Sequence, residues 1–135
     1  MNVFVIGIGL IGGSMALDIQ KNYSEAVIYG IDTNENHLNE AKTLGLVHQK
    51  ATFNELEKAD MVIVSIPVDV QLEVISKVLE KISDNCLVLD VGSTKSQVCE
   101  AVNNHPKRRN FLATHPIAGT EFSGPKAAHS GLFQG

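Results

Sequence analysis

The residues of this chain whose types and spacing are best suited to chemistry are glycines near its start. Gly7, Gly9 and Gly12 follow a β-branched apolar run in the spacing G-x-G-x-x-G. The first glycine permits a tight turn, the second lets the backbone approach a pyrophosphate, and the third allows close helix–strand packing. The helix that follows begins with free N–H groups at the positive end of its dipole, which favours an anion. The turn, with its Leu10 and Ile11, is therefore a candidate cofactor site.

An acid at the end of the second predicted strand, residues 26–31, supports this interpretation. Asp32 lies about 20 residues beyond the glycine motif, the separation expected of a carboxylate that hydrogen-bonds the ribose hydroxyls of a dinucleotide. Thr33 and Asn34 follow it, with no arginine to receive a ribose phosphate, which predicts NAD over NADP. The alternative is a parallel-sheet protein whose glycine turn binds nothing, and the strand–turn–helix–strand–acid context disfavours it.

Strands and helices are predicted to alternate along the chain. We expect helices over 15–21, 34–44, 69–82 and about 96–103, a capped turn over 52–58, and further strands over 61–66, 86–91 and 110–114. This alternation predicts one α/β domain over residues 1–135, a doubly wound parallel sheet of the Rossmann type in three layers. Five strands are expected, one fewer than in the complete two-halved fold. Because ligands bind at the carboxyl ends of such strands, Ser65, Pro67 and Gly92 join the candidate cofactor residues.

A histidine follows the last predicted strand, where the nicotinamide of a bound dinucleotide would lie. His115 can change charge near neutral pH, so it is a natural acceptor for the proton released when an alcohol loses hydride. A histidine that merely caps the strand end is an equally good interpretation. Ser93 could orient the imidazole or cap the following helix. Glu121 could gate the site or lie exposed at the surface.

Composition narrows the class of protein. The net charge of −4 excludes a broad basic surface for nucleic acid, and the one basic cluster, residues 107–109, is expected in a solvated loop. Two isolated cysteines, no signal peptide and no uninterrupted apolar span predict a reduced cytoplasmic protein without a membrane segment. No metal site is expected, because the other histidines lie away from the predicted strand ends without ligand spacing; they are His37, His48, His105 and His129.

Three blocks of the chain together resemble the prephenate dehydrogenases of tyrosine biosynthesis. They are GIGLIGGS at 7–14, DVGSTK at 90–95 and HPIAGTEFSGP at 115–125. The first block is common to many dehydrogenases, whereas the second and third, in this order, are far more specific. The resemblance covers essentially the whole chain.

The resemblance implies an enzyme that oxidatively decarboxylates prephenate to 4-hydroxyphenylpyruvate with NAD. His115 matches the family's histidine that accepts a hydrogen bond from the ring hydroxyl, Ser93 matches its partner serine, and Glu121 matches an acid at the pocket mouth. Family members continue into a helical domain that completes the substrate pocket and builds a homodimer. A chain truncated before that domain, able to bind NAD and poorly active alone, is therefore implied. Arogenate dehydrogenase and an NAD-sensing regulatory module are the alternatives.

Overall fold

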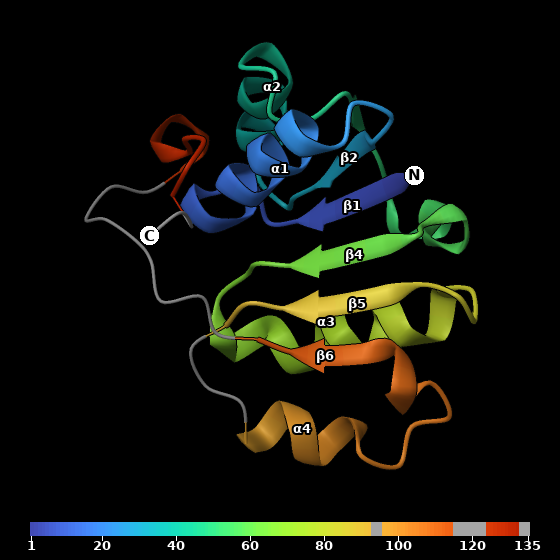
Figure 1. Cartoon of the computed structure of the whole chain (residues 1–135). Helices are drawn as coiled ribbons and strands as arrows, with labels where there is room; N and C mark the ends of the chain where they lie inside the picture. Colours follow the sequence, from blue (N-terminus) through green and yellow to red (C-terminus); the bar gives the residue numbers. More distant parts are fainter. Residues whose placement is uncertain (93–95, 115–123, 133–135) are drawn as a thin grey trace.

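The computed structural model describes residues 1–92, 96–114 and 124–132. Within these ranges, the strands form one parallel sheet in the order β3-β2-β1-β4-β5-β6 (Figure 1). The strands are β1 (Asn2–Ile6), β2 (Val27–Ile31), β3 (Gln49–Lys50), β4 (Met61–Val64), β5 (Leu87–Asp90) and β6 (Phe111–Ala113). The helices are α1 (Leu10–Asn22), α2 (Glu35–Thr43), α3 (Val68–Lys81) and α4 (Ser96–Val102), with short 3-10 turns η1 (Phe53–Lys58), η2 (Arg108–Asn110) and η3 (Pro125–Ala127). The predicted doubly wound α/β fold is confirmed.

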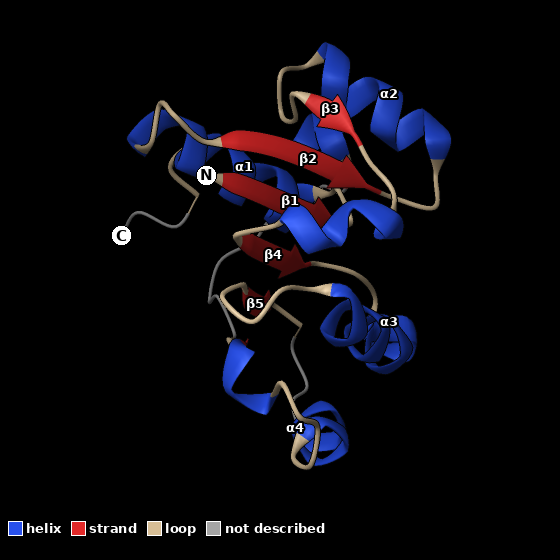
Figure 2. Ribbon diagram, turned by 90° about the vertical axis from the view of Figure 1, so that its right-hand side faces the viewer, coloured by secondary structure: helices blue, strands red, loops and turns tan. Residues whose placement is uncertain are grey.

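The expectation of five strands is wrong, because a sixth strand pairs with the outer edge of β2. This strand, β3, consists of Gln49 and Lys50, which lie opposite Tyr29 and Gly30 (Figure 2). Both of its side chains are exposed, so the strand lacks the apolar alternation by which strands are identified in a sequence. The sheet has all six strands of the two-halved fold, and the strand count gives no support for a truncated domain.

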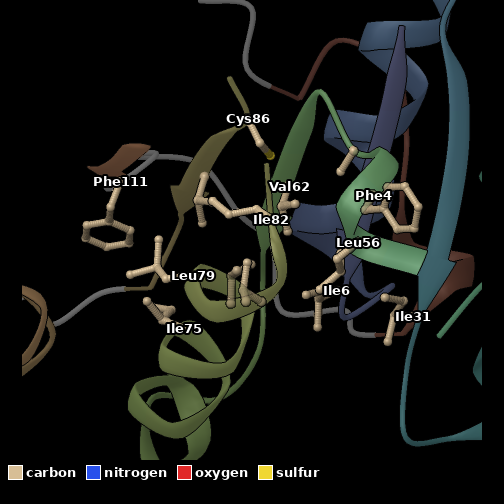
Figure 3. Packing of buried hydrophobic residues seen from close by; sticks show 14 of the residues in the cluster. Phe4, Ile6, Ile31, Leu56, Val62, Ile75, Leu79, Ile82, Cys86 and Phe111 are labelled. Atoms are coloured by element: carbon tan, nitrogen blue, oxygen red, sulfur yellow. The ribbon is translucent and has the colours of Figure 1, made fainter. Parts of the chain in front are cut away.

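Alternate residues of β1 face opposite sides of the sheet, and helices cover both sides. Phe4 and Ile6 belong to a buried cluster that includes residues of η1, α3 and α4, of which Figure 3 shows ten labelled members. Val3 and Val5 belong to a second cluster, with residues of α1 and α2. Continuous apolar strands fit such a sheet because both of their faces are buried. The chain therefore forms three layers, with a core on each face of the sheet.

Helix α1 begins earlier than predicted, at Leu10 instead of residue 15. Two glycines in its first turns, each of which costs roughly 1 kcal/mol in a helix interior, hide the helical pattern in the sequence. Packing explains why they are retained: a Cβ atom on Gly12 would lie 2.3 Å from the carbonyl oxygen of Gly7, and one on Gly13 would lie 2.7 Å from the Cβ of Ala128. Close contacts on two sides of the helix therefore override helix propensity.

Polar caps fix the starts of two elements beside the carboxyl edge of the sheet. Asn34 caps α2, since its Oδ1 accepts hydrogen bonds from the N–H groups of Asn36 and His37 at 3.0 and 3.2 Å. Thr52 and Glu55 form the predicted capping box of η1. The Thr52 N–H donates to the Glu55 carboxylate over 2.8 Å and lowers the pKa of that carboxyl below its ordinary value.

The basic cluster at residues 107–109 is only partly a solvated loop. Lys107 donates to the carbonyl oxygen of Ile82 and lies 3.9 Å from the Asp84 carboxylate. Arg108 donates to the carbonyl oxygen of Phe111 over 3.0 Å. The cluster therefore joins the end of α3 to the start of β6. None of the helices in the described ranges combines the length and the apolar character needed to cross a membrane.

Candidate functional site

The carboxyl ends of β1, β2 and β4 open into one cavity of about 990 Å³. Its lining includes five of the residues that the sequence predicts for cofactor binding: Gly7, Gly9, Asp32, Ser65 and Pro67. They come together because the strands are parallel and their carboxyl ends lie along the same edge of the sheet.

The glycine turn forms the floor of this cavity against the end of β4. Gly7 adopts a φ of +91°, a conformation that favours glycine, and a Cβ atom there would lie 2.0 Å from the carbonyl oxygen of Ser65. Gly9, in contrast, has nothing within 4 Å of the place where its Cβ would stand. The backbone is thus bare on the side where a ligand can approach it, as the second glycine of the motif requires.

The first turn of α1 supplies backbone donors that have no acceptor within the helix. The first intrahelical hydrogen bond runs from the Gly13 N–H to the Gly9 carbonyl over 2.9 Å. The N–H groups of Leu10, Ile11 and Gly12 precede it and have no acceptor within the helix. Although these three residues are not part of the cavity's described lining, they place the positive end of the helix next to Gly9. This arrangement can bind a phosphate without a basic side chain.

Asp32 joins the glycine turn to the end of β2. Its Oδ2 accepts the N–H of Ile8 over 3.0 Å, and its Oδ1 accepts the N–H of Asn34 over 2.9 Å. A carboxylate has about four acceptor positions, so these two bonds leave capacity for further donors. The carboxylate is therefore held in place beside the cavity and can accept hydrogen bonds from the hydroxyls of a sugar.

His37, which we expected away from the strand ends, lines the same cavity. Its Nδ1 lies 3.9 Å from Oδ2 of Asp32. The reason is the cap on α2: because Asn34 accepts the N–H of His37, the third residue of the helix is drawn back toward the loop after β2. The sequence contains a signal for this placement: Asp32 ends the strand, Asn34 can cap the next helix, and His37 then falls in the first helical turn.

One wall of the cavity is apolar, and sequence reasoning missed it. Its side chains come from the segment after β3 and from the segment that leads from β4 into α3: Ala51, Phe53, Ile66, Val70 and Val74. Polar groups border this wall, among them Thr52 and the ion pair of Glu73 with Lys77 at 2.9 Å. An apolar wall with a few polar groups at its border is typical of small-molecule sites and suits a flat aromatic ring.

The remaining predicted residues lie at or beyond the ends of β5 and β6. Gly92 follows β5 outside the cavity's described lining, and its N–H donates to Oδ1 of Asp90 over 2.9 Å. Thr114 follows β6, and its N–H and hydroxyl both donate to the Asp90 carbonyl oxygen, at 2.8 and 2.7 Å. Ser93, His115 and Glu121 lie outside the described residues. In the sequence, Ser93 and His115 directly follow Gly92 and Thr114, two residues that are held at the end of β5.

Among residues 1–92, 96–114 and 124–132, no group of three or more His, Cys, Asp or Glu side chains could hold a metal ion.

Comparison with known proteins relates this architecture to one family. The family model described as prephenate dehydrogenase, nucleotide-binding domain, matches residues 15–135. A prephenate dehydrogenase of Lactococcus lactis is 35% identical over 98% of this chain and 38% of its own length. The crystal structure of prephenate dehydrogenase from A. aeolicus, in complex with hydroxyphenyl propionate and NAD+, has a TM-score of 0.91 and 31% identity, covering 100% of this chain and 48% of that one. Arogenate dehydrogenase from Synechocystis has a TM-score of 0.86 and 27% identity, covering 98% and 46%. The chain therefore spans less than half the length of these relatives.

Proposed function

Because this chain belongs to the family of prephenate dehydrogenase nucleotide-binding domains, we propose that it binds NAD and serves the NAD-dependent oxidative decarboxylation of prephenate. The observation that carries the proposal is the cavity at the carboxyl ends of β1, β2 and β4. It combines a bare glycine turn and a fixed carboxylate, next to the first turn of α1, whose N–H groups have no acceptor within the helix.

Each part of the cavity suits one part of a dinucleotide. The N–H groups of Leu10, Ile11 and Gly12 suit the pyrophosphate, and Asp32 suits ribose hydroxyls. The apolar wall that contains Val70 and Val74 suits the adenine ring. The described lining contains no arginine that could pair with the ribose phosphate of NADP, and the Asp32 carboxylate would repel that phosphate. We therefore propose NAD as the cofactor in preference to NADP.

The chemical step is assigned to residues outside the described ranges, on the resemblance of their motifs to those of the family. Bound NAD supplies the hydride acceptor. His115 takes the proton of the ring hydroxyl as hydride leaves the carbon that bears this hydroxyl. Ser93 orients the imidazole, and Glu121 lies at the mouth of the pocket. The bond to the ring carboxylate then breaks, its electron pair enters the ring as carbon dioxide departs, and the aromatic oxygen recovers the proton. Since aromatisation drives this loss, the protein mainly has to align donor, acceptor and base.

Two related substrates are candidates for this reaction. Prephenate and arogenate differ by a keto or an amino group on the side chain, and relatives of both names match this chain. We favour prephenate, because the Lactococcus lactis prephenate dehydrogenase is more similar in sequence than the Synechocystis arogenate dehydrogenase. The helical domain and the homodimer, implied by the resemblance, and the cytoplasmic location, predicted from the composition, are predictions for the complete protein.

The experiment is reduced-nicotinamide formation by the complete gene product, measured with prephenate and arogenate, each with NAD and NADP. We expect prephenate- and NAD-dependent turnover that His115→Asn removes while NAD affinity stays within about twofold. Turnover with arogenate but not with prephenate would identify arogenate as the substrate. Tight NAD binding without turnover of either substrate would contradict the proposed catalytic function and favour an NAD-sensing module.

A further inference from the structure

Two polar side chains beyond the end of β2 lie too far apart to bond each other directly and close enough to share a partner. Nδ1 of His37 lies 3.9 Å from Oδ2 of Asp32, and both residues line the cofactor cavity. An N–H···O hydrogen bond spans about 2.7–3.2 Å, so the pair does not form one. Polar groups at the observed separation can be bridged by an oxygen atom that bonds to both. The gap therefore fits one bridging oxygen.

The Asp32 carboxylate is held in place and still has a free acceptor position at this gap. Its side chain is only 13% exposed, and Oδ2 accepts the N–H of Ile8 over 3.0 Å. A carboxylate oxygen has about two acceptor positions, so the bond from Ile8 occupies one of them. Oδ2 can therefore accept another hydrogen bond without losing its contact with the glycine turn.

The cap of α2 holds His37 beside this carboxylate. The N–H of His37 donates to Oδ1 of Asn34 over 3.2 Å, and the N–H of Asn34 donates to Oδ1 of Asp32 over 2.9 Å. The imidazole is 41% exposed, so a ligand in the cavity can reach it. Hydrogen on Nδ1 is favourable beside the negative charge of Asp32, and imidazole carries it there in one neutral tautomer and in the imidazolium alike. The ring can therefore donate into the gap.

A hydroxyl group suits this gap because it is a donor and an acceptor at once. It can donate its hydrogen to Oδ2 of Asp32 while its oxygen accepts the N–H of His37. An ionised phosphate has no hydrogen to donate, and the carboxylate would repel it. The repulsion is increased by other acids of the cavity's described lining, which are Glu35, Asp69 and Glu73. The pair therefore favours a sugar hydroxyl over a phosphate ester.

We propose that His37 is a cofactor-binding residue, whose Nδ1–H donates to the adenosine ribose hydroxyl that donates to Asp32. The inference rests on the proposed function, and it adds a donor to a ribose site that so far contains an acceptor alone. Either of the two ribose hydroxyls can fill the gap. One hydroxyl would thus be bound from both sides, by the end of β2 and by the first turn of α2.

The test measures the Kd of NAD for His37→Leu and His37→Asn in the complete gene product. Leucine removes the donor, whereas the asparagine amide keeps an N–H₂ group close to the position of Nδ1. Asn36→Leu is the matched control, because Asn36 is an exposed residue on the same turn of α2, outside the cavity's described lining. We expect His37→Leu to raise the Kd roughly threefold to tenfold, the effect of one lost hydrogen bond. His37→Asn and the control should stay within about twofold of the unsubstituted protein.

NAD analogues whose adenosine ribose lacks the 2′ or the 3′ hydroxyl provide the second measurement. For the analogue that lacks the bridging hydroxyl, His37→Leu should change the Kd by less than about 1.5-fold, because the hydrogen bond is already absent. For the other analogue, the substitution should keep its full effect. A merely structural effect of the substitution on α2 would instead weaken the binding of NAD and of both analogues by the same factor.

Two results would overturn the inference: a Kd of NAD for His37→Leu within about 1.5-fold of the unsubstituted protein, or equal losses of affinity for NAD and both analogues. Failure of the proposed function is distinguishable. If the unsubstituted protein binds NAD but forms no NADH with prephenate, the catalytic function is wrong, and the titrations still decide the role of His37. If the unsubstituted protein does not bind NAD, the proposed function and the inference are both wrong.

Discussion

The N–H of Ile8 donates to Oδ2 of Asp32 over 3.0 Å, so a single carboxylate connects the glycine turn after β1 to the end of β2. Its other oxygen accepts the N–H of Asn34 at the start of α2. Asp32 therefore has two roles: it shapes the phosphate-binding turn, and it offers its remaining lone pairs to a ligand. A substitution at this residue is expected to affect both.

Asp32→Asn should weaken NAD binding roughly tenfold to a hundredfold, because it removes a charged acceptor and turns an amide N–H₂ toward one of two backbone donors. The affinity for NADP should fall less, since the negative charge that repels a ribose phosphate is lost. Titration of both dinucleotides measures the two constants. Asp69→Asn, which changes another acid of the cavity, is the control. Equal losses for NAD and NADP would contradict the assigned role.

Gly9→Ala and Gly12→Ala should fail in different ways, although both alter the same motif. Nothing lies within 4 Å of a Cβ atom at Gly9, whereas one at Gly12 would lie 2.3 Å from the carbonyl oxygen of Gly7. Gly9→Ala should therefore keep its thermal stability and lose NAD affinity, because the methyl group occupies the approach to the phosphate site. Gly12→Ala should lower the melting temperature itself. Calorimetry and NAD titration separate the two effects, and a stable Gly9→Ala variant with full affinity would place the pyrophosphate elsewhere.

Gln71→Leu should stabilise the fold. Gln71 lies on α3 with 0% of its surface exposed, and its carboxamide nitrogen and oxygen have no hydrogen-bond partner among the described residues. A buried polar group without a partner costs roughly 1–3 kcal/mol, so a leucine of similar size should raise the free energy of unfolding by a similar amount. Urea denaturation measures it.

Gln71→Glu is the informative companion, because it keeps the shape and adds a buried charge that should destabilise the protein. The prediction for Gln71→Leu is wrong if that variant is less stable than the unsubstituted chain, which would mean that the carboxamide has a partner. The carboxamide also lies against the backbone after β5, since a Cβ atom at Gly92 would lie 2.4 Å from Nε2 of Gln71.

Much of the site could be predicted because each of its parts follows a strand with a strong pattern of its own. The apolar runs before Gly7, Asp32 and Ser65 identify three buried strands, and parallel pairing brings their carboxyl ends to one edge. The sequence also contains the spacing of the capping box at Thr52 and Glu55, which the structure confirms. Local patterns of this kind need no knowledge of the rest of the fold.

The missed features depend on contacts that leave no periodic pattern. Strand β3 contributes backbone pairing alone, and its side chains are exposed. Val70 lies exposed on the cavity side of α3, while the core stripe of the same helix includes Ile75 and Leu79. Apolar residues outside a core stripe cannot be told from ordinary surface residues by periodicity. The packing of Ala128 against α1 depends on the absence of a side chain at Gly13. In the sequence, this glycine only weakens the predicted start of the helix.

Alkaline pH should destabilise the protein through Cys86. Burial raises the pKa of its thiol from 9.0 to about 11; the negative charge of Asp60 adds to this effect, and Lys107 opposes it. Below pH 9 the thiol is protonated in both the folded and the unfolded chain. Between pH 9 and pH 11 it ionises in the unfolded chain alone, which favours unfolding. The stability held below pH 9, on the order of 3 kcal/mol for this group, should be lost as the pH rises through about 11.

Cys86→Ala isolates this contribution from that of other groups that titrate at alkaline pH. The variant should be less stable than the unsubstituted protein at pH 8, because it removes a buried sulfur atom, and the gap should narrow or reverse by pH 10.5. Free energies of unfolding in urea at the two pH values measure the change. The second cysteine offers a matched control: Cys99 is partly exposed on α4, so Cys99→Ala should keep the alkaline slope of the unsubstituted protein. Parallel slopes for Cys86→Ala and the unsubstituted protein would show that the buried thiol ionises no differently in the folded chain.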